Sequence, residues 1–177
     1  MSRPVTAAAV KLVVSVFAPS PDLIGSAIEA LSDLYGEADF VSGVIPFDET
    51  DYYAPEMGAP LVRRFVAFER LVPPESLPDI KRQTNAVEER FMSAGRRRVN
   101  IDPGYLAEAH LILATGKGYA HRPYLRDGIY ADLTLTYQRK AFRPLPWTYP
   151  DYAGPVVIGL LEKIRAKYML QRRGTQA

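Results

Sequence analysis

The fold of this chain is indicated most clearly by the stretch VKLVVSVFAPSPDLIGSAIEALSDLYG, residues 10–36. Residues 10–17 alternate weakly and are rich in β-branched side chains, which predicts a buried strand. Ser20 is a typical N-cap residue and Pro21 suits the first helical position, so a helix should begin here. Gly36 stands where it would end that helix. This part of the chain therefore predicts a strand that leads directly into an amphipathic helix.

The following residues add strands and a second helix to this unit. Residues 39–47 and 61–71 predict two more strands, which an acidic, aromatic loop at 48–60 separates. Apolar side chains then recur at helical spacing over residues 77–91, and a short fourth strand follows at 99–101. The order βαββαβ is the split βαβ or ferredoxin-like plan, so we expect an α+β fold with a ferredoxin-like start.

The remainder of the chain extends this start. Asp102 and Pro103 together predict one short turn of helix. The other elements that we expect are three strands and a closing amphipathic helix, at residues 110–114, 119–125, 129–139 and 156–170. The predicted architecture is a ferredoxin-like βαββαβ start with an antiparallel β extension and a C-terminal helix. At this length, residues 1–177 are expected to form a single domain.

The composition excludes several classes of site. The chain has no cysteine, which rules out disulfides, thiolate metal sites and cysteine nucleophiles. Its two histidines make a histidine-rich metal site improbable, whereas an oxygen-ligand cofactor such as Mg²⁺ stays possible without specific support. No run of apolar residues is long enough to span a membrane. The N-terminal stretch resembles a signal peptide, but Lys11 interrupts its apolar run and residues 19–21 follow it in place of a small-residue cleavage site, so we expect a cytoplasmic protein.

Charge is unevenly distributed along the chain. Residues 1–60 contain nine acidic and two basic side chains, whereas residues 61–177 contain eleven acidic and twenty basic ones. An anionic partner would therefore meet the second part first. The same distribution is also expected if the two parts simply attract each other within one molecule.

Asp127 and Gly128 predict a hairpin turn. A two-residue loop would place charged side chains opposite apolar ones across the two strands. A three-residue loop that starts at Arg126 avoids this and puts Gly128 at the left-handed position that such loops favour. We therefore expect the three-residue loop.

The expected register of this hairpin gathers polar side chains on one face. It places Tyr124 opposite Tyr130 and Arg122 opposite Asp132, where opposite charges stabilise each other. An arginine held by an aspartate presents a fixed guanidinium group that suits a phosphate or a carboxylate. A solvated sheet face with an ordinary ion pair would show the same alternation. His121 falls on the apolar face and is expected to be a core histidine.

Four other segments contain candidate residues. Lys117 lies in a Gly-rich turn that lacks the spacing of a Walker loop but could still contact an anion. The loop at 48–60 could hold a hard cation through Asp48, Glu49, Asp51 and Glu56, or Glu56 or Asp51 could pair with Arg63, Arg64 or Arg122. Asn100 and Asp102 should share one face of their strand. The aromatic residues Trp147, Tyr149 and Tyr152 could form a stacking lid or could pack a Pro-rich loop onto the domain.

Four motifs carry a resemblance to a known family: YYAPEMG, VNIDPGYL, LATGKGYAHRPYLRDGIYADLTL and WTYPDY. They resemble a bacterial family catalogued as domain of unknown function 4416, and the resemblance spans nearly the whole chain. It implies no established activity. Some members carry the label of GTP-binding protein, so the resemblance implies GTP as a ligand to test. The sequence itself has neither a Walker A motif nor an NKxD-type guanine-reading motif.

From these observations we expect a cytoplasmic protein that binds a small anionic or nucleotide-like ligand, either as a binding protein or as an enzyme. The expected ligand-binding residues are Arg122, Asp132, Tyr124, Tyr130, Lys117, Asn100 and Trp147. If a reaction takes place, Asp102 or Glu56 is the expected acid or base. The alternative is an interaction module without catalysis, which would bind RNA or an acidic protein through Arg96–Arg98 and the basic C-terminal helix.

Overall fold

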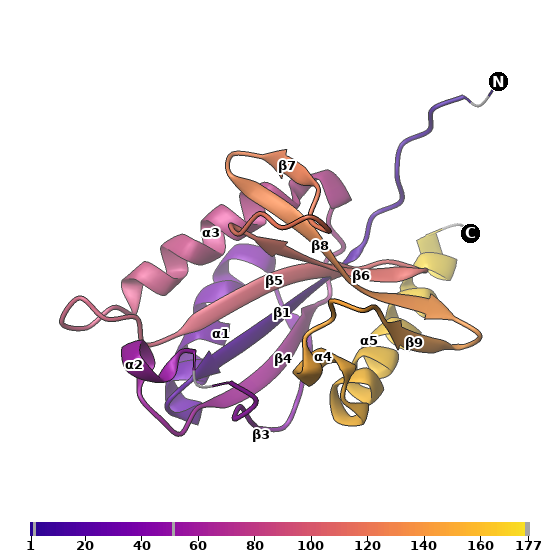
Figure 1. Ribbon diagram of the computed structural model, residues 1–177. Coiled ribbons are helices and arrows are strands. Elements are labelled where there is room, and N and C mark those ends of the chain that lie inside the picture. The colour runs from indigo at the N-terminus through magenta and orange to yellow at the C-terminus, as the bar shows by residue number, and fades with distance from the viewer. Residues whose placement is uncertain (2, 51, 176–177) are drawn as a thin grey trace.

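The computed structural model describes residues 1, 3–50 and 52–175. Within these residues, nine strands form one sheet (Figure 1). In chain order they are β1 (Lys11–Ala18), β2 (Ala38–Val41), β3 (Ile45–Pro46), β4 (Val62–Phe68), β5 (Asn100–Leu106), β6 (His110–Thr115), β7 (Tyr124–Arg126), β8 (Ile129–Gln138) and β9 (Ala141–Pro144). The sheet runs in the order β2-β4-β1-β5-β6-β8-β7, with β3 beside β4 and β9 beside β8. All of these pairings are antiparallel.

Helices pack against both faces of the sheet. They are α1 (Pro21–Tyr35), α2 (Ala54–Met57), α3 (Leu77–Arg90), α4 (Pro150–Ala153) and α5 (Pro155–Thr175), with a 3₁₀ turn at Pro74–Ser76. Alternate residues of β1 point to opposite faces. Leu12, Val14, Val16 and Ala18 join the hydrophobic cluster of α1 and α3, and Val13 on the other face joins the cluster of α5 and β9. The structure is thus a mixed α+β fold with a large antiparallel sheet. In the described part of the chain, no helix is both long and apolar enough to cross a membrane.

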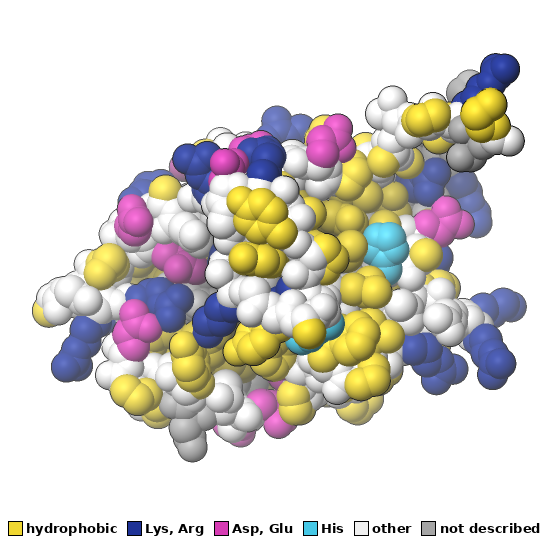
Figure 2. Space-filling model, turned by 45° about the horizontal axis from the view of Figure 1, so that its top comes forward, with side chains coloured by type: hydrophobic (Ala, Val, Ile, Leu, Met, Phe, Trp, Pro, Cys, Tyr) yellow, Lys and Arg dark blue, Asp and Glu magenta, His cyan; other side chains and the backbone are white. Residues whose placement is uncertain are grey.

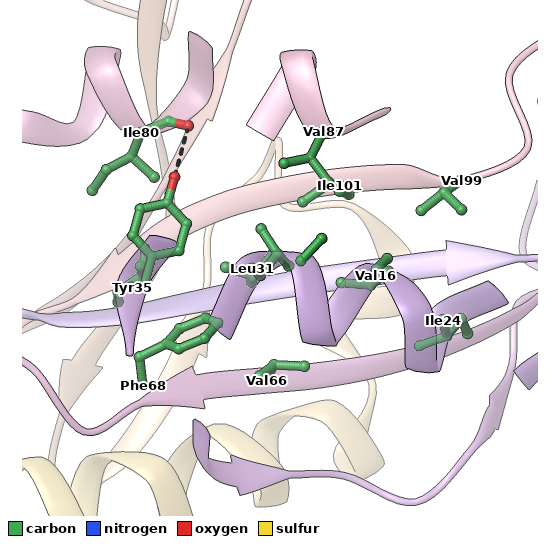
Figure 3. Packing of buried hydrophobic residues seen from close by; sticks show 14 of the residues in the cluster. Val16, Ile24, Leu31, Tyr35, Val66, Phe68, Ile80, Val87, Val99 and Ile101 are labelled. Carbon is green, nitrogen blue, oxygen red and sulfur yellow. Dashed lines mark hydrogen bonds between the residues drawn. The ribbon is translucent and has the colours of Figure 1, made fainter. Parts of the chain in front are cut away.

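The first helix begins and ends where the sequence predicts. The Ser20 side chain accepts a hydrogen bond from the backbone N–H of Leu23, and Gly36 takes a left-handed φ of 88° after the last turn. Leu31 of this helix is fully buried against the sheet (Figure 3). The Tyr35 hydroxyl donates to the carbonyl of Ile80 and so joins α1 to α3. Local capping and apolar spacing therefore agree with the tertiary packing.

The predicted helical turn at Asp102 and Pro103 is wrong, because both residues continue strand β5. Pro103 lacks a backbone N–H and is tolerated in a strand only where the ladder is unpaired on that side. Residues two apart in a strand direct their backbone N–H and C=O groups to the same side, so Ile101 reports on the side that Pro103 faces. The N–H and C=O of Ile101 bond to side chains of α3. Pro103 therefore faces a side of β5 that has no strand partner at this point.

The predicted hairpin is correct in its tyrosine pair and wrong in its loop. Tyr124 pairs with Tyr130 as expected, but the strand β7 is shorter than predicted. The loop has two residues, because Arg126 pairs with Ile129 and the intervening Asp127 and Gly128 both have positive φ. A register shift between Tyr124 and Arg126 adds one residue to β7. This bulge restores the pairing that the three-residue loop had been expected to supply.

Candidate functional site

The sheet divides between β5 and β6. These strands pair only over Gly104–Leu106 and Leu111–Leu113, so residues 100–103 have no partner on that side. Gly104 stands at the point of division. A Cβ atom there would overlap the carbonyl oxygen of Ile112 and the side chain of Leu113, so glycine is needed for the strands to approach this closely. Beyond Gly104 the two strands separate.

The separation opens a cleft of about 1010 Å³. Small-molecule sites commonly measure about 300–1,000 Å³, so a mononucleotide or a sugar phosphate would fit. The walls come from β5, from β6 and the loop after it, and from α3. The acidic loop contributes Glu49, Thr50, Tyr52, Tyr53 and Glu56, and residues 149–152 also line the cleft. The described lining also includes Phe17, Phe47, Arg63, Arg97 and Asp132. The cleft thus combines segments that lie far apart in the sequence.

Helix α3 supplies the hydrogen bonds that a neighbouring strand would otherwise provide. Glu88 Oε1 accepts from the N–H of Ile101 at 2.6 Å, and Lys81 Nζ donates to the carbonyl of the same residue at 3.0 Å. Lys81 also lies 3.6 Å from Asp102 Oδ1. Burial raises the pKa of Glu88, although the nearby Lys81 opposes this shift. The backbone of Ile101, which has no strand partner on this side, is therefore satisfied by charged side chains of α3.

A chain of hydrogen bonds fixes the predicted polar residues of this wall. Asn100 Nδ2 donates to Asp102 Oδ2 at 2.7 Å, and Arg97 donates to Asn100 Oδ1 at 2.7 Å. The other terminal nitrogen of Arg97 donates to Glu56 Oε2 at 2.8 Å. The expected partners of Glu56 were Arg63, Arg64 and Arg122, so the arginine was predicted wrongly. Asp51, the other acidic candidate, lies outside the described residues.

The opposite wall contains the predicted pair of Arg122 and Asp132. Arg122 Nε donates to Asp132 Oδ2 at 2.7 Å, which confirms that these side chains meet. The remaining nitrogens of Arg122 donate to the Tyr149 hydroxyl at 3.0 Å and to the Lys117 carbonyl at 3.2 Å. Only 4% of the Arg122 side chain is exposed. This arginine therefore orders the wall, and it leaves little surface for direct contact with a ligand.

Lys117 has a different environment. Its Nζ donates to the Tyr52 hydroxyl at 3.1 Å and lies 4.4 Å from the centre of the Tyr52 ring. Among the described cations that line the cleft, Lys117 is the one without a carboxylate partner in an ion pair. Its ammonium group is therefore available to an anion.

A model of the family described as Domain of unknown function (DUF4416) matches residues 8–168. The chain belongs to this family. The match confirms the resemblance carried by the four motifs and includes every segment that lines the cleft. No curated protein matches the chain, and no solved structure does so either.

Three of the predicted ligand-binding residues of this DUF4416 chain lie outside the described lining of the cleft. Tyr124 and Tyr130 pack edge to face with ring centres 5.2 Å apart. Trp147 donates its indole N–H to the carbonyl of Leu133 and stacks on His121 with ring centres 5.0 Å apart. These aromatic side chains support the hairpin and the loop behind the Arg122 wall.

His121 does not occupy the apolar core position that was predicted for it. Its ring stacks between Tyr119 and Trp147, and its Nε2 lies 3.8 Å from Asp132 Oδ2. The expected alternation fails because residues 119–123 form no strand. His121 therefore places an imidazole ring beside the carboxylate that holds Arg122.

The DUF4416 cleft also contains Lys81 and Glu88, which were not predicted as site residues, and Arg63, which was predicted only as a partner of the acidic loop. Lys81 and Glu88 stand seven positions apart, which places them on one face of α3 beside its buried stripe. That spacing was visible in the sequence and could have indicated a shared environment. Arg63 is 4% exposed, lies over the Phe47 ring at 4.0 Å and pairs with Asp151. Nothing in its strand pattern distinguishes it from a solvated arginine.

The basic segments are partly engaged within the molecule. Arg97 turns into the cleft, while its neighbours Arg96 and Arg98 remain exposed. On α5, Arg165 and Arg172 both bond to Glu108, and Lys167 bonds to Asp39. On the face shown in Figure 2, basic and acidic side chains are interspersed over much of the surface. The uneven charge of the two parts of the chain is therefore used partly for intramolecular pairing.

The described residues contain no group of three or more His, Asp or Glu side chains placed to hold a metal ion. Glu56 of the acidic loop at 48–60 forms an ion pair with Arg97.

Proposed function

We propose that this protein binds a small anionic or nucleotide-like compound in the cleft between β5 and β6. The observation that carries this proposal is the convergence of three predicted polar elements on one hollow: Lys117, the pair of Arg122 and Asp132, and the pair of Asn100 and Asp102. A cleft with a few convergent polar groups is the usual form of a small-molecule site.

In the proposed complex, Arg122 has a positioning role and Lys117 contacts the ligand. Arg122 holds the Lys117 carbonyl and the Tyr149 hydroxyl, so the wall is ordered before a ligand arrives. The lysine ammonium is a compact charge with freely turning donors, which suits a phosphate or carboxylate oxygen. Tyr52 and Tyr119 also line the cleft and can cover a planar ligand group.

If the bound compound also reacts, Asp102 suits the role of acid or base better than Glu56. Asn100 orients one oxygen of Asp102, while the other stays 3.6 Å from Lys81. Glu56 is held in a direct ion pair with Arg97 at 2.8 Å. A carboxylate that is oriented and whose cation lies 3.6 Å away is a better proton acceptor than one held in a direct ion pair at 2.8 Å.

We also propose that the first half of the fold follows the ferredoxin-like plan. The strand order β2-β4-β1-β5 with antiparallel neighbours, and the helices α1 and α3 on one face, support this assignment. The cleft would then be a feature of the antiparallel extension, because it opens where β6 joins β5.

A thermal-shift screen of the purified full chain tests the proposed binding. The screen covers nucleotides including GTP, sugar phosphates and short RNA, each with and without magnesium. A ligand at a hundred times its dissociation constant should add about 2.7 kcal/mol of stability. Lys117→Met should abolish that shift, whereas Lys163→Met, which alters an exposed lysine on α5, should preserve it. Salt-sensitive RNA binding without any small-molecule shift would instead support the interaction module.

A further inference from the structure

We infer that the two walls of the cleft select opposite ends of one ligand. The wall that contains Lys117, Arg122 and Asp132 (the Lys117 wall) binds a single anionic group. The wall that contains Asn100 and Asp102 (the Asp102 wall) binds a hydroxyl or amino group. The ligand class is thus a monophosphorylated or carboxylated compound that bears hydrogen-bond donors, such as a sugar phosphate or a nucleoside monophosphate. This inference rests on the proposed binding function.

The charge of the lining disfavours a polyanion. Seven carboxylates and five cations line the cleft among the residues that the structure describes. Four of those cations already have a carboxylate partner: Arg63, Lys81, Arg97 and Arg122. A triphosphate would meet one available ammonium group and two carboxylates, Glu49 and Glu89, that have no cation partner among the described residues. Like charges repel strongly in a sheltered site. A single anionic group can be matched by Lys117 alone.

The Lys117 wall is built to present its ammonium group. The backbone of Lys117 is fixed at both of its polar groups, because its N–H donates to Thr115 Oγ1 at 3.1 Å and its carbonyl accepts from Arg122. The ammonium group itself contacts only the neutral hydroxyl and ring of Tyr52 among the described residues. A charged ligand oxygen forms a stronger hydrogen bond than a neutral hydroxyl, so it can replace Tyr52 as the partner.

The Asp102 wall presents acceptor oxygens. Asn100 occupies one site on Oδ2, whereas Oδ1 lies 3.6 Å from Lys81, which is beyond ordinary hydrogen-bond length. About a third of the Asp102 side chain is exposed, at 34%, and it lines the cleft. An ionised carboxylate only accepts hydrogen bonds, so this wall favours ligand hydroxyl or amino groups and disfavours anionic ones.

Isothermal titration of the full chain with two series of probes tests this inference. One series is guanosine monophosphate, guanosine, GTP and inorganic phosphate, and the other is glucose 6-phosphate, glucose and inorganic phosphate. At least one monophosphate should bind ten-fold or more tightly than its unphosphorylated parent (guanosine or glucose) and than inorganic phosphate. If that compound is guanosine monophosphate, it should also bind ten-fold or more tightly than GTP. Lys117→Met should remove the advantage over the parent. Asp102→Asn should remove the advantage over inorganic phosphate. Lys163→Met should change neither.

The outcomes separate this inference from the proposed function. Lys117-dependent binding of GTP or inorganic phosphate as tight as that of the monophosphates would overturn the two-ended selection and leave the proposed function in place. Binding that Lys117→Met does not weaken, or no binding by any probe, would overturn both. Thermal unfolding of each variant shows whether it is folded, and the comparison among probes on the unaltered chain does not depend on any variant.

Discussion

Strand β5 has a different partner arrangement on each of its two sides. Towards β1 it is paired over seven successive residues, from Asn100 to Leu106, whereas towards β6 it is paired over three. Towards β1, its fully paired side, strand β5 shares a hydrophobic core with β1, β4, α1 and α3, to which it contributes Ile101. On the divided side, the backbone of Ile101 is bonded by Glu88 and Lys81, and polar side chains surround a cleft. Where strand pairing stops, charged side chains replace backbone partners and leave room for a ligand.

The largest effect on stability is expected from the fully paired side. Leu31→Ala deletes a fully buried side chain between α1 and the sheet, and such truncations typically cost about 2–5 kcal/mol in the free energy of unfolding. Leu34→Ala is the matched control, since Leu34 lies on the same helix but is exposed. Its effect should stay within about 0.5 kcal/mol. Urea denaturation measures both, and equal losses would show that α1 does not pack as described.

A smaller effect is expected at the point where β5 and β6 separate. Gly104→Ala places a methyl group against the backbone of Ile112, so the strands must move apart at a cost of about 1–3 kcal/mol. Gly159→Ala is the control. Nothing lies within 4 Å of its added Cβ, and alanine in the helix α5 should stabilise the protein by up to about 1 kcal/mol. If Gly104→Ala were as harmless in urea denaturation, close strand contact would not determine where the sheet divides.

The fully paired side could be predicted from the sequence because its determinants are local. Ser20, Pro21 and Gly36 cap a helix whose apolar spacing matches its buried face, and β1 is recognised from its β-branched residues. The register of the hairpin was also predictable in part, since opposite charges at Arg122 and Asp132 favour one pairing. The helix and β1 are predicted from residues that are neighbours in the sequence, and the hairpin register is predicted from a single pair of strands.

The divided side could not be predicted in the same way. The dipeptide Asp102-Pro103 is compatible both with the start of a helical turn and with a strand that is unpaired on one side. Only the position of α3 decides between these two structures. Lys81 and Glu88 look like the polar flank of an ordinary amphipathic helix until β5 lies beside them. His121 was misplaced because alternation was assumed for residues that form no strand. The cleft depends on contacts between elements that no local pattern reveals.

The smallest effect, and the one most specific to the divided side, concerns the pH dependence contributed by Glu88. Burial raises the pKa of Glu88 above its ordinary value of 4.5, so the folded state holds this proton more tightly than the unfolded state does. Stability falls with rising pH wherever the folded state binds more protons. The contribution of Glu88 is therefore fully present below pH 4.5 and is lost as the pH rises through the higher pKa of the folded state.

Glu88→Gln keeps an oxygen that can accept from the N–H of Ile101 but cannot ionise. The variant should therefore become more stable relative to the unaltered protein, with a larger free energy of unfolding, as the pH rises from 4.5 to neutral. Urea denaturation at several pH values measures this difference, and Glu89→Gln is the control, because Glu89 is exposed on the next position of α3. A difference that stays constant across this range would mean that Glu88 is as well solvated as its neighbour. The backbone of β5 would then be open to water on the divided side, and α3 would not replace the missing strand.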